Sequence, residues 1–437
     1  MKNLLIWIDS SIKIKSKIIK MNNSLQKEFD TIILVTKNEK TASIYRSELI
    51  NAYSIQKIIS NSLNKKGFNK IKINHPNLNS NLLDQIYLLG FHKESYLDDS
   101  FNFDPMVELS IFNNLWLEFI NKKEITHTLT LNGFSIPSFA LSFISRSRGL
   151  NNLFWENGLL PNSLFINKSG VNALSDPEIN IASEGYEGNV FDNKGIKDLI
   201  NIISNNNNKK QNILVTLQVD NDSNIKIFSP FFGVNDFIYF ICTEIAIISD
   251  FNIRFRNHPK NKFIILKNYK YLRNISVSDN NNSLNQDFNW SDVVITINST
   301  TGLESILKNK PCISFGSSYY SKFLKKYKYK YLEGHIPFYI NDPSNKEQKL
   351  NNANLMDSLN QFSLDMQESE KVWENKILNN FKKEIKPFHE NNELIKYVTF
   401  EKYVRLRNNI RNKLKKLLTF VLKKIMWIIQ YINNQIL

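Results

Sequence analysis

The stretch from Trp290 to Gly316 constrains the fold of this chain more than any other. Its sequence, WSDVVITINSTTGLESILKNKPCISFG, begins with an apolar run at 293–298 that predicts a buried strand. A small hydroxylated turn at 299–302 follows, then a helical pattern at 303–309, and then a second apolar run at 311–316. Two strands joined by a helix in so little chain predict a parallel pair within an α/β fold.

The same alternation of strand and helix runs through most of the chain. Further strands are predicted at 4–8, 31–36, 70–74, 85–90, 127–133, 152–158, 213–219 and 252–259. Helical patterns are predicted at 40–67, 137–149 and 237–251, and the first two of them close at a glycine. Repeated strand–helix units predict a mostly parallel sheet with helices on both faces.

An asparagine- and lysine-rich segment at 204–211 divides the pattern in two. Such low-complexity polar chain rarely packs, so we place a loop or linker there. We therefore expect two Rossmann-like lobes, an N-terminal one over 1–200 and a C-terminal one over 212–400, followed by a tail over 401–437. Because ligands of open α/β sheets bind beyond the carboxyl ends of the strands, two facing lobes define a central cleft.

The net charge of +15 is concentrated at the end of the chain. Residues 401–437 hold nine lysines and arginines against one acidic residue, and over 405–437 apolar side chains recur at helical spacing. This pattern predicts a basic amphipathic helix. The sequence leaves two alternatives open for this helix. It contacts an anionic membrane, or it packs on the first lobe with its basic face in water. A nucleic-acid partner is not expected, because no RNA- or DNA-binding signature accompanies the charge.

The sequence gives little reason to expect export or a metal site. The two cysteines, Cys242 and Cys312, are far apart in apolar runs, which indicates a reducing cytoplasm rather than a disulfide framework. No CxxC motif or Cys/His cluster predicts a metal site. The N-terminus fits a first buried strand rather than a signal peptide, and no stretch of about 18 uncharged apolar residues predicts a membrane span.

The turn Ser299–Gly302 is the first candidate binding feature. Backbone amides at the start of a helix carry partial positive charge, and a strand that ends at the cleft presents them to an anion. Ser299, Thr300 and Thr301 would add donors without bulk, and Gly302 allows a tight backbone. Plain N-capping of the helix by a hydroxyl is the simpler alternative.

The motif Arg254-Phe-Arg-Asn-His-Pro259 is a second candidate, at the end of a strand in the same lobe. The His258 imidazole can donate to a phosphate or protonate a leaving group, and Arg254 and Arg256 can supply positive charge. The His-Pro pair alone is weak, because Asn-His-Pro also occurs at 74–76.

Acidic and amide side chains provide the remaining candidates. Glu156 follows an apolar strand and precedes a glycine, so its carboxylate is expected at the cleft edge of the first lobe, as a general base or nucleophile. A strand-end glutamate in water is the alternative. Gln218, Asp220 and Asp222 can contact sugar or ribose hydroxyls, or cap a turn. Residues 319–331 interleave tyrosine with lysine, and we expect a solvated helix face there rather than a lipid or donor contact.

These motifs together resemble the capsule polysaccharide biosynthesis proteins, the β-Kdo glycosyltransferases that build the Kdo linker of capsules. The chain is most similar to the type that starts this linker on a lipid. The resemblance spans roughly 125–340 and rests on residues 155–175, 213–230, 254–259 and 293–316. It implies a GT-B-like fold and CMP-Kdo as donor substrate, with no further cofactor.

The resemblance also implies roles for individual residues. Glu156-Asn157-Gly158 matches an acidic motif that carries the catalytic carboxylate, and Asn157 in place of a second acid leaves open whether Glu156 is base or nucleophile. His258 and the Ser299-Thr300 pair match motifs that hold or protonate the cytidine monophosphate. The resulting prediction is that Glu156 and His258 are catalytic, and that the donor is bound by Gln218, Arg256, Asn298, Ser299, Thr300, Thr301 and Gly302.

The expected function is that of a cytoplasmic glycosyltransferase in capsule or surface polysaccharide synthesis, transferring Kdo from CMP-Kdo to a lipid or glycolipid. Peripheral contact with the inner face of the cytoplasmic membrane, and with capsule assembly or export machinery, would accompany that role. Two alternatives stay open. One is transfer of another CMP-activated acidic sugar of the sialate type, and the other is a non-catalytic capsule assembly or export component.

Overall fold

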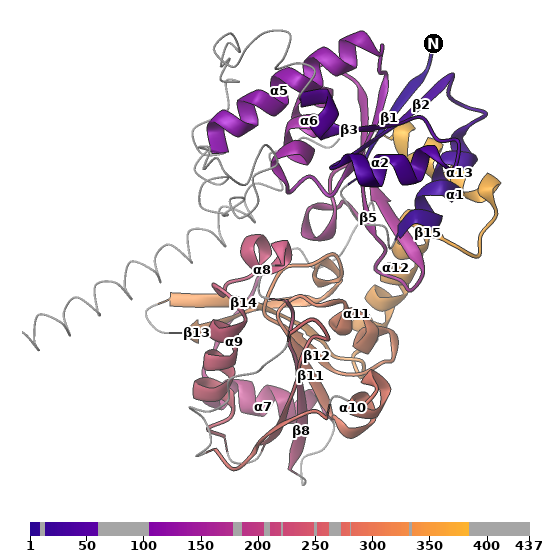
Figure 1. Cartoon of the computed structure of the whole chain (residues 1–437). Helices are drawn as coiled ribbons and strands as arrows, with labels where there is room; N and C mark the ends of the chain where they lie inside the picture. The colour runs from indigo at the N-terminus through magenta and orange to yellow at the C-terminus, as the bar shows by residue number, and fades with distance from the viewer. Residues whose placement is uncertain are drawn as a thin grey trace, which may run out of the picture.

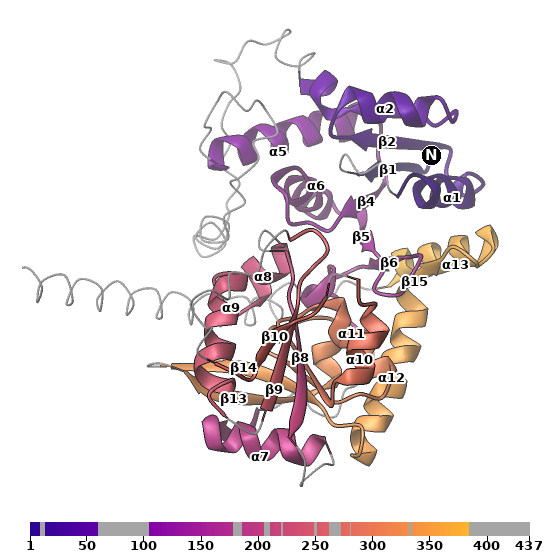
Figure 2. The same ribbon diagram turned by 60° about the horizontal axis from the view of Figure 1, so that its bottom comes forward.

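The computed structural model describes residues 1–8, 14–59, 105–177, 186–204, 210–219, 222–248, 251–261, 272–279, 281–331 and 334–383. These residues form two α/β lobes, one above the other in Figures 1 and 2, each built on its own sheet. The predicted strands at 70–74 and 85–90 and the predicted tail helix lie outside the described residues. Within the described ranges, no helix is both long and apolar enough to cross a bilayer.

The first lobe is built on a sheet whose strands run in the order β15-β6-β5-β4-β1-β2-β3. Its strands are β1 (Asn3–Trp7), β2 (Thr31–Thr36), β3 (Ala52–Ser54), β4 (His127–Leu131), β5 (Asn151–Asn157), β6 (Ser163–Asn167) and β15 (Ser363–Asp365). The first five are parallel, whereas β6 and β15 pair antiparallel at one edge. The order 3-2-1-4-5 is that of a Rossmann-like half.

Helices cover both faces of this first sheet (Figure 1). They are α1 (Lys15–Leu25), α2 (Glu39–Arg46), α5 (Pro105–Lys122), α6 (Ile136–Ser147) and α13 (Glu370–Lys382), with a short 3-10 turn, η4 (Asn172–Leu174). The α6 helix ends at Ser147, and Gly149 in the following turn adopts φ +67°, a conformation that glycine reaches without steric cost. The buried Trp7 and Trp116 rings meet edge to face with centroids 5.5 Å apart, which joins α5 to the sheet.

The second lobe repeats the arrangement in a sheet ordered β10-β9-β8-β11-β12-β14-β13-β7. Its strands are β7 (Tyr186–Phe191), β8 (Gln211–Thr216), β9 (Phe251–Arg256), β10 (Ile275–Val277), β11 (Val293–Thr296), β12 (Cys312–Ser314), β13 (Lys325–Tyr331) and β14 (Gly334–Asn341). Counted from β8, the five parallel strands again follow the order 3-2-1-4-5. Both lobes therefore have a topological switch point, which in this lobe lies between β8 and β11.

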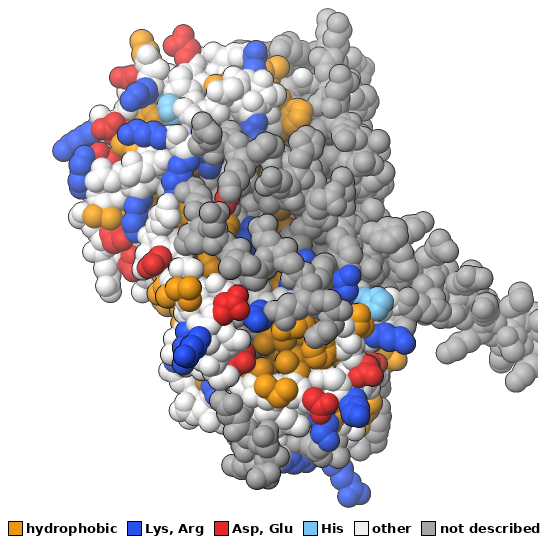
Figure 3. All heavy atoms as spheres, turned by 180° about the vertical axis from the view of Figure 1, so that it is seen from behind, with side chains coloured by type: hydrophobic (Ala, Val, Ile, Leu, Met, Phe, Trp, Pro, Cys, Tyr) orange, Lys and Arg blue, Asp and Glu red, His pale blue; other side chains and the backbone are white. Residues whose placement is uncertain are grey.

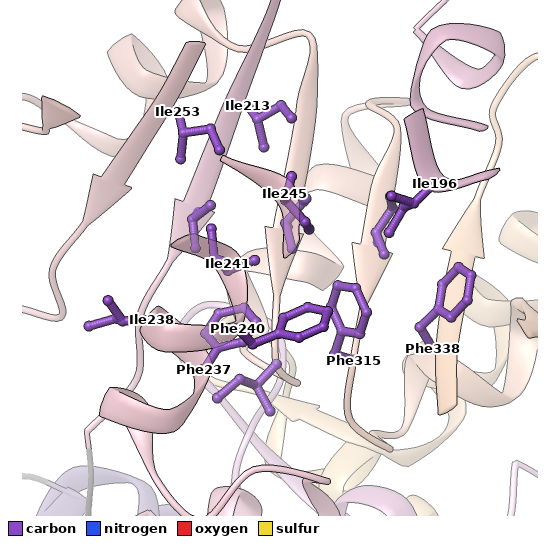
Figure 4. Packing of buried hydrophobic residues seen from close by; sticks show 14 of the residues in the cluster. Ile196, Ile213, Phe237, Ile238, Phe240, Ile241, Ile245, Ile253, Phe315 and Phe338 are labelled. Atoms are coloured by element: carbon purple, nitrogen blue, oxygen red, sulfur yellow. The ribbon is translucent and has the colours of Figure 1, made fainter. Parts of the chain in front are cut away.

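The second sheet encloses the largest apolar cluster of the described chain. Its helices are α7 (Asn193–Ile203), α8 (Ser223–Phe228), α9 (Val234–Phe240), the π-helical turn η5 (Ile241–Ile245), α10 (Leu284–Trp290), α11 (Thr300–Leu307), the 3-10 turn η7 (Tyr320–Phe323) and α12 (Lys346–Phe362). Figure 4 shows isoleucines of the sheet packed against η5 and against a row of phenylalanines. Phe240 and Phe315 meet with ring centroids 5.0 Å apart. From behind, hydrophobic side chains also gather on the surface of this lobe, bordered by charged ones (Figure 3).

The predicted fold class, two Rossmann-like lobes, is confirmed by the two parallel-rich sheets. The expected strand–turn–helix–strand of 293–316 is present as β11, α11 and β12, with all four residues of β11 buried. β-Branched residues suit a strand buried on both faces, and Ser299 caps the following helix.

Two sequence expectations about local structure are wrong. The helix predicted over 40–67 ends at Arg46, because a turn with Leu49 at φ +61° leads into β3, which pairs with β2. Residues 319–331 do not form a solvated helix face. They form η7 and then β13, whose Tyr329 and Tyr331 are buried in the core.

Each sheet takes a strand from beyond the predicted lobe boundaries, which themselves stay a prediction. β7 precedes residue 200 but pairs with β13 of the second sheet. β15 follows the second lobe in sequence but pairs with β6 of the first, and α13 packs beside α1 (Figure 1). The chain therefore crosses between the lobes more than once.

An apolar seam joins the two lobes. It consists of buried residues from both lobes, including Phe134, Phe154, Phe165 and Leu174 from the first and Phe228, Leu303, Tyr319, Phe323, Leu359 and Phe362 from the second. The Phe165 ring lies 5.1 Å from the Tyr319 ring and 5.9 Å from the Phe362 ring. Burial of aromatic surface on this scale fixes the position of one lobe against the other.

Candidate functional site

A cavity of about 380 Å³ opens between the lobes, within the size range of small-molecule sites. Most of its wall comes from the carboxyl ends of β8, β9 and β11 in the second lobe. The first lobe contributes Leu159 and Asn172. The cavity thus lies at the switch point between β8 and β11, where ligands of open α/β sheets bind.

The N-terminus of α11 forms one wall of the cavity. Ser299 is its N-cap and accepts a hydrogen bond from the Thr301 amide at 3.2 Å, and Ser299, Thr300 and Thr301 all line the cavity. The structure confirms the capping alternative, and anion binding by the same turn stays a prediction. Such a helix start favours phosphate or carboxylate.

Gly302 does not line the cavity in the structure. It is a buried residue of α11, and a Cβ at this position would lie 2.4 Å from the Tyr320 hydroxyl, which itself donates to the Ser299 carbonyl at 2.9 Å. The glycine is therefore needed for close packing beneath the turn rather than for donor contact.

Gln218 and Asn298 line the cavity, but their amides are paired with each other. The Gln218 Nε2 donates to Asn298 Oδ1 at 2.9 Å, and the Asn298 backbone amide donates to Gln218 Oε1 at 3.2 Å. Asn298 Nδ2 also donates to the carbonyls of Asn224 and Ser317. Both side chains are buried, so they fix the loops after β8 and β11 relative to each other.

His258 lines the cavity from the end of β9. Its Nδ1 accepts a hydrogen bond from the Lys260 backbone amide at 3.1 Å, which leaves the proton of the neutral ring on Nε2. Burial and the positive charge of Lys260 lower the pKa of His258, against the raising effect of Asp222. A neutral ring with Nε2–H is a hydrogen-bond donor, which favours holding an anion over protonating a leaving group.

The charge of Arg256 is already paired. Its guanidinium lines the cavity but also pairs with Asp287, and Arg254 pairs with the same carboxylate at 3.2 Å while stacking 3.8 Å from the Trp290 ring. Burial raises the pKa of Asp287, but hydrogen bonds from Ser278, Arg256 and Arg254 outweigh it and hold the pKa below its usual value. The arginines therefore contribute less free charge than the sequence suggested.

Glu156 lies at the end of β5, half-buried, and the Asn172 side chain donates to its Oε2 at 3.0 Å. Burial and the negative charge of Asp222 raise the pKa of Glu156 to about 7, against the lowering hydrogen bonds from Asn172 and Asn132. The alternative of a strand-end glutamate in water does not fit this environment. A carboxyl group with a pKa near neutrality can exchange a proton at physiological pH.

Two site residues carried little sequence signal. Asp222 caps α8, accepting from the Asn224 amide at 2.9 Å, and lines the cavity where its charge acts on both Glu156 and His258. The sequence placed it only as a sugar contact or a turn cap. Asn172 was not among the residues predicted for the site. Its φ of +53°, which asparagine tolerates, cannot be recognised from a single sequence. Asp220 lies outside the described residues.

The cavity therefore brings the Asp222 carboxylate, a neutral histidine and a helix N-terminus to one place. Glu156 does not line the cavity itself, but it accepts a hydrogen bond from Asn172, which does. Nothing in the described ranges gathers three or more His, Cys, Asp or Glu side chains as a metal site would. The arrangement can bind an anionic group on the second lobe, with the Asp222 carboxylate on the same cavity wall.

Comparison with known proteins shows a family similarity over the second lobe. Residues 190–362 match the model of the family described as capsule polysaccharide biosynthesis protein. Protein FixF of Sinorhizobium fredii is 24% identical over 212 residues, which are 44% of this chain and 49% of FixF. The chain thus spans about half the length of that relative.

Solved structures with a similar arrangement include KpsC of Thermosulfurimonas dismutans, named as a β-Kdo 2,4 transferase. It is 19% identical, and the match covers 44% of this chain and 70% of KpsC with a TM-score of 0.31. Acinetobacter baumannii MurG is 7% identical over 92% of this chain and 95% of its own, also with a TM-score of 0.31. At such scores neither likeness bears on the chemistry of the cavity.

The family match covers the cavity walls of the second lobe but not Glu156, since it begins at residue 190. It starts later than the resemblance drawn from the sequence motifs and extends further, to 362. Over residues 190–362, this chain is similar to the capsule polysaccharide biosynthesis protein family, the family that its sequence motifs resemble.

Proposed function

We propose that this protein is a glycosyltransferase of capsule polysaccharide synthesis that transfers Kdo from CMP-Kdo to a lipid or glycolipid. One observation supports this most. A single interlobe cavity is lined by the α11 N-terminus, by His258 and, from the first lobe, by Asn172, which holds Glu156. An anion site close to a carboxylate suits sugar transfer from a nucleotide donor.

The second lobe would hold the donor through its phosphate. The amides and hydroxyls at Ser299–Thr301 suit a phosphate, and the Nε2–H of His258 suits the oxygen that bridges phosphate and sugar. When the bond between this oxygen and the anomeric carbon breaks, the electron pair leaves with cytidine monophosphate. Donors already in place stabilise the developing charge without reorganisation.

One carboxylate would attack the anomeric carbon, and the other would accept the proton of the acceptor hydroxyl. The resemblance implies retention of configuration, and a retaining double displacement uses one carboxylate as nucleophile and another as acid or base. The pKa of about 7 suits Glu156 to proton transfer, which leaves Asp222 as the nucleophile. Asp222 would form a bond to the anomeric carbon as the bond to cytidine monophosphate breaks. The acceptor oxygen would then displace the Asp222 carboxylate from that carbon while the acceptor's proton passes to Glu156.

The acceptor and the location of the protein belong to the same proposal. A lipid or glycolipid acceptor would approach from the first lobe, and the basic segment 401–437, which lies outside the described residues, would contact an anionic cytoplasmic membrane. Cytidine monophosphate leaves as a product, and no cofactor beyond the donor is part of the scheme.

The test is release of cytidine monophosphate from CMP-Kdo, made in the assay, with lipid acceptors supplied in detergent. Wild type should release it in an acceptor-dependent manner, Glu156→Gln should lose at least 100-fold of that rate, and Glu370→Gln, an exposed glutamate on α13, should match wild type. Equal rates for Glu156→Gln and wild type would refute the assigned role.

Repeating the assay with other CMP-sugars distinguishes the alternative functions. Turnover of CMP-sialate in place of CMP-Kdo would support the same chemistry on another acidic sugar. Binding of finished polysaccharide with no turnover of any CMP-sugar would instead support an assembly or export component.

A further inference from the structure

We propose that Thr216 and Asn257 form the subsite that reads the hydrogen-bonding edge of the donor's nucleobase. This inference rests on the proposed function and deepens it. It starts from two buried polar atoms that line the cavity and that have no hydrogen-bond partner among the described residues, Thr216 Oγ1 and Asn257 Oδ1.

The two residues lie side by side at the ends of neighbouring strands. Thr216 of β8 pairs in register with Arg256 of β9, and the Leu217 amide donates to the Arg256 carbonyl at 3.0 Å. Asn257 follows Arg256 directly. Both polar groups therefore face the cavity from adjacent strand ends, and the Thr216 side chain is only 3% exposed.

Unlike Thr216 Oγ1 and Asn257 Oδ1, the neighbouring polar side chains have hydrogen-bond partners. Gln218 and Asn298, from the loops after β8 and β11, satisfy each other's amides. Thr296, which pairs with Thr216 in register, donates through its hydroxyl to the Thr216 carbonyl at 3.4 Å. A buried polar group without a partner destabilises the fold, so such groups are kept where a ligand satisfies them.

The chemistry of the pair selects a base over a phosphate. A carbonyl oxygen needs a donor, and an ionised phosphate has none, whereas the edge of a pyrimidine offers donors and acceptors next to each other. Asn257 can turn either its carbonyl or its amino group toward such an edge. Leu217, Pro259 and Leu284 line the same cavity and provide apolar surface for the faces of a ring.

The phosphate has its own place in the same cavity. Ser299–Thr301 and His258 provide its donors, so a nucleotide would bind with its phosphate at the α11 N-terminus and its base against β8 and β9. Binding would then divide into a phosphate part and a base part that can be measured separately.

The experiment is calorimetric titration of CMP and of ribose 5-phosphate into wild type, Thr216→Val and Asn257→Leu. Both changes replace a polar group by an apolar one of similar shape. CMP should bind about tenfold more weakly to each variant, whereas ribose 5-phosphate should bind as it does to wild type. Thr216→Ser, which restores the hydroxyl, should recover CMP affinity.

Melting temperatures in the absence of nucleotide provide the structural control. Thr216→Val and Asn257→Leu should melt at or above the wild-type temperature, because each removes an unsatisfied buried group. Thr296→Val, which removes a paired hydroxyl on the neighbouring strand, should melt lower.

Three outcomes distinguish a failure of the base subsite from a failure of the proposed function. Unchanged CMP affinity in both variants, or an equal loss for ribose 5-phosphate, overturns the base subsite alone. Wild-type binding of UMP but not CMP, weakened by the variants, supports the subsite and contradicts the cytidine donor. No binding of any nucleoside phosphate to wild type overturns both.

Discussion

At the residue scale, Glu156 carries the most specific consequence of the structure. Its folded-state pKa of about 7 lies above the ordinary glutamate pKa of 4.5, so the folded chain binds this proton more tightly than the unfolded chain does. Stability therefore falls as pH rises from about 4.5 to about 7, by up to about 3 kcal/mol. Glu156→Gln should remove that loss and be more stable than wild type at pH 8, measured by urea unfolding across this range. Parallel pH dependence in variant and wild type would contradict the environment described for this carboxyl group.

The pH dependence of the reaction distinguishes two roles for the same residue. If Glu156 accepts the acceptor's proton, the rate should rise as pH passes through about 7, because the carboxylate is then the active form. A rate that falls through that range would show that the protonated form acts. The measurement is the pH profile of kcat/KM.

His258 gives a second prediction at this scale. Since the neutral ring donates through Nε2, His258→Gln, whose amide nitrogen can occupy a similar position, should retain most CMP affinity. His258→Phe, which has no donor, should lose about tenfold by titration calorimetry. If glutamine and phenylalanine are equally poor, the charge or shape of the ring matters rather than its hydrogen bond.

The sequence motifs predicted which residues line the cavity better than they predicted the contacts of those residues. His258 and the hydroxyls at 299–301 line the cavity, whereas Glu156 does not line it and is hydrogen-bonded to Asn172, which does. Pairing changed the roles of the others, because a sequence does not show that Gln218 and Asn298 bond to each other or that Asp287 neutralises Arg256. Such partners are far apart along the chain and meet only through the fold.

At the element scale, α11 combines structural and binding roles, and these can be separated. Ser299→Ala removes the N-cap and should cost about 1 kcal/mol of stability as well as CMP affinity. Ser369→Ala removes the equivalent cap of α13, which accepts from the Val372 amide, and should cost similar stability with no effect on CMP. Equal CMP affinity in the two variants would show that the α11 start only caps.

Strand and helix patterns predicted most elements, but they did not predict how strands with weak sequence patterns pair. The β11–α11–β12 unit follows directly from its apolar runs. The sequence of β13 alternates lysine with tyrosine, and only its place between β14 and β7 buries the tyrosines. β3 has three residues and forms because β2 supplies a free edge, which local helix propensity cannot reveal.

At the scale of the whole molecule, the apolar seam predicts that the lobes unfold together. Phe165→Ala deletes a ring that packs on Tyr319 and Phe362 of the other lobe, whereas Phe112→Ala deletes a buried ring within the first lobe alone. Each should cost about 3–5 kcal/mol. Only Phe165→Ala should split a single calorimetric transition into two. A single transition in both variants would mean that the seam does not couple the lobes.

The exchange of strands between lobes could not be predicted from the sequence. β7 and β15 are short, and their partners lie more than 130 residues away in the chain, so no local pattern shows where they pair. These crossings, with the seam, place Leu159 and Asn172 of the first lobe on the wall of a cavity that the second lobe mostly forms.

The most direct test of the central claim is a crystal structure with CMP bound. The account predicts the phosphate within hydrogen-bonding distance of the Ser299–Thr301 turn and of His258 Nε2, with Glu156 and Asp222 facing the side where the sugar would attach. CMP bound elsewhere, or with its phosphate away from α11, would contradict it.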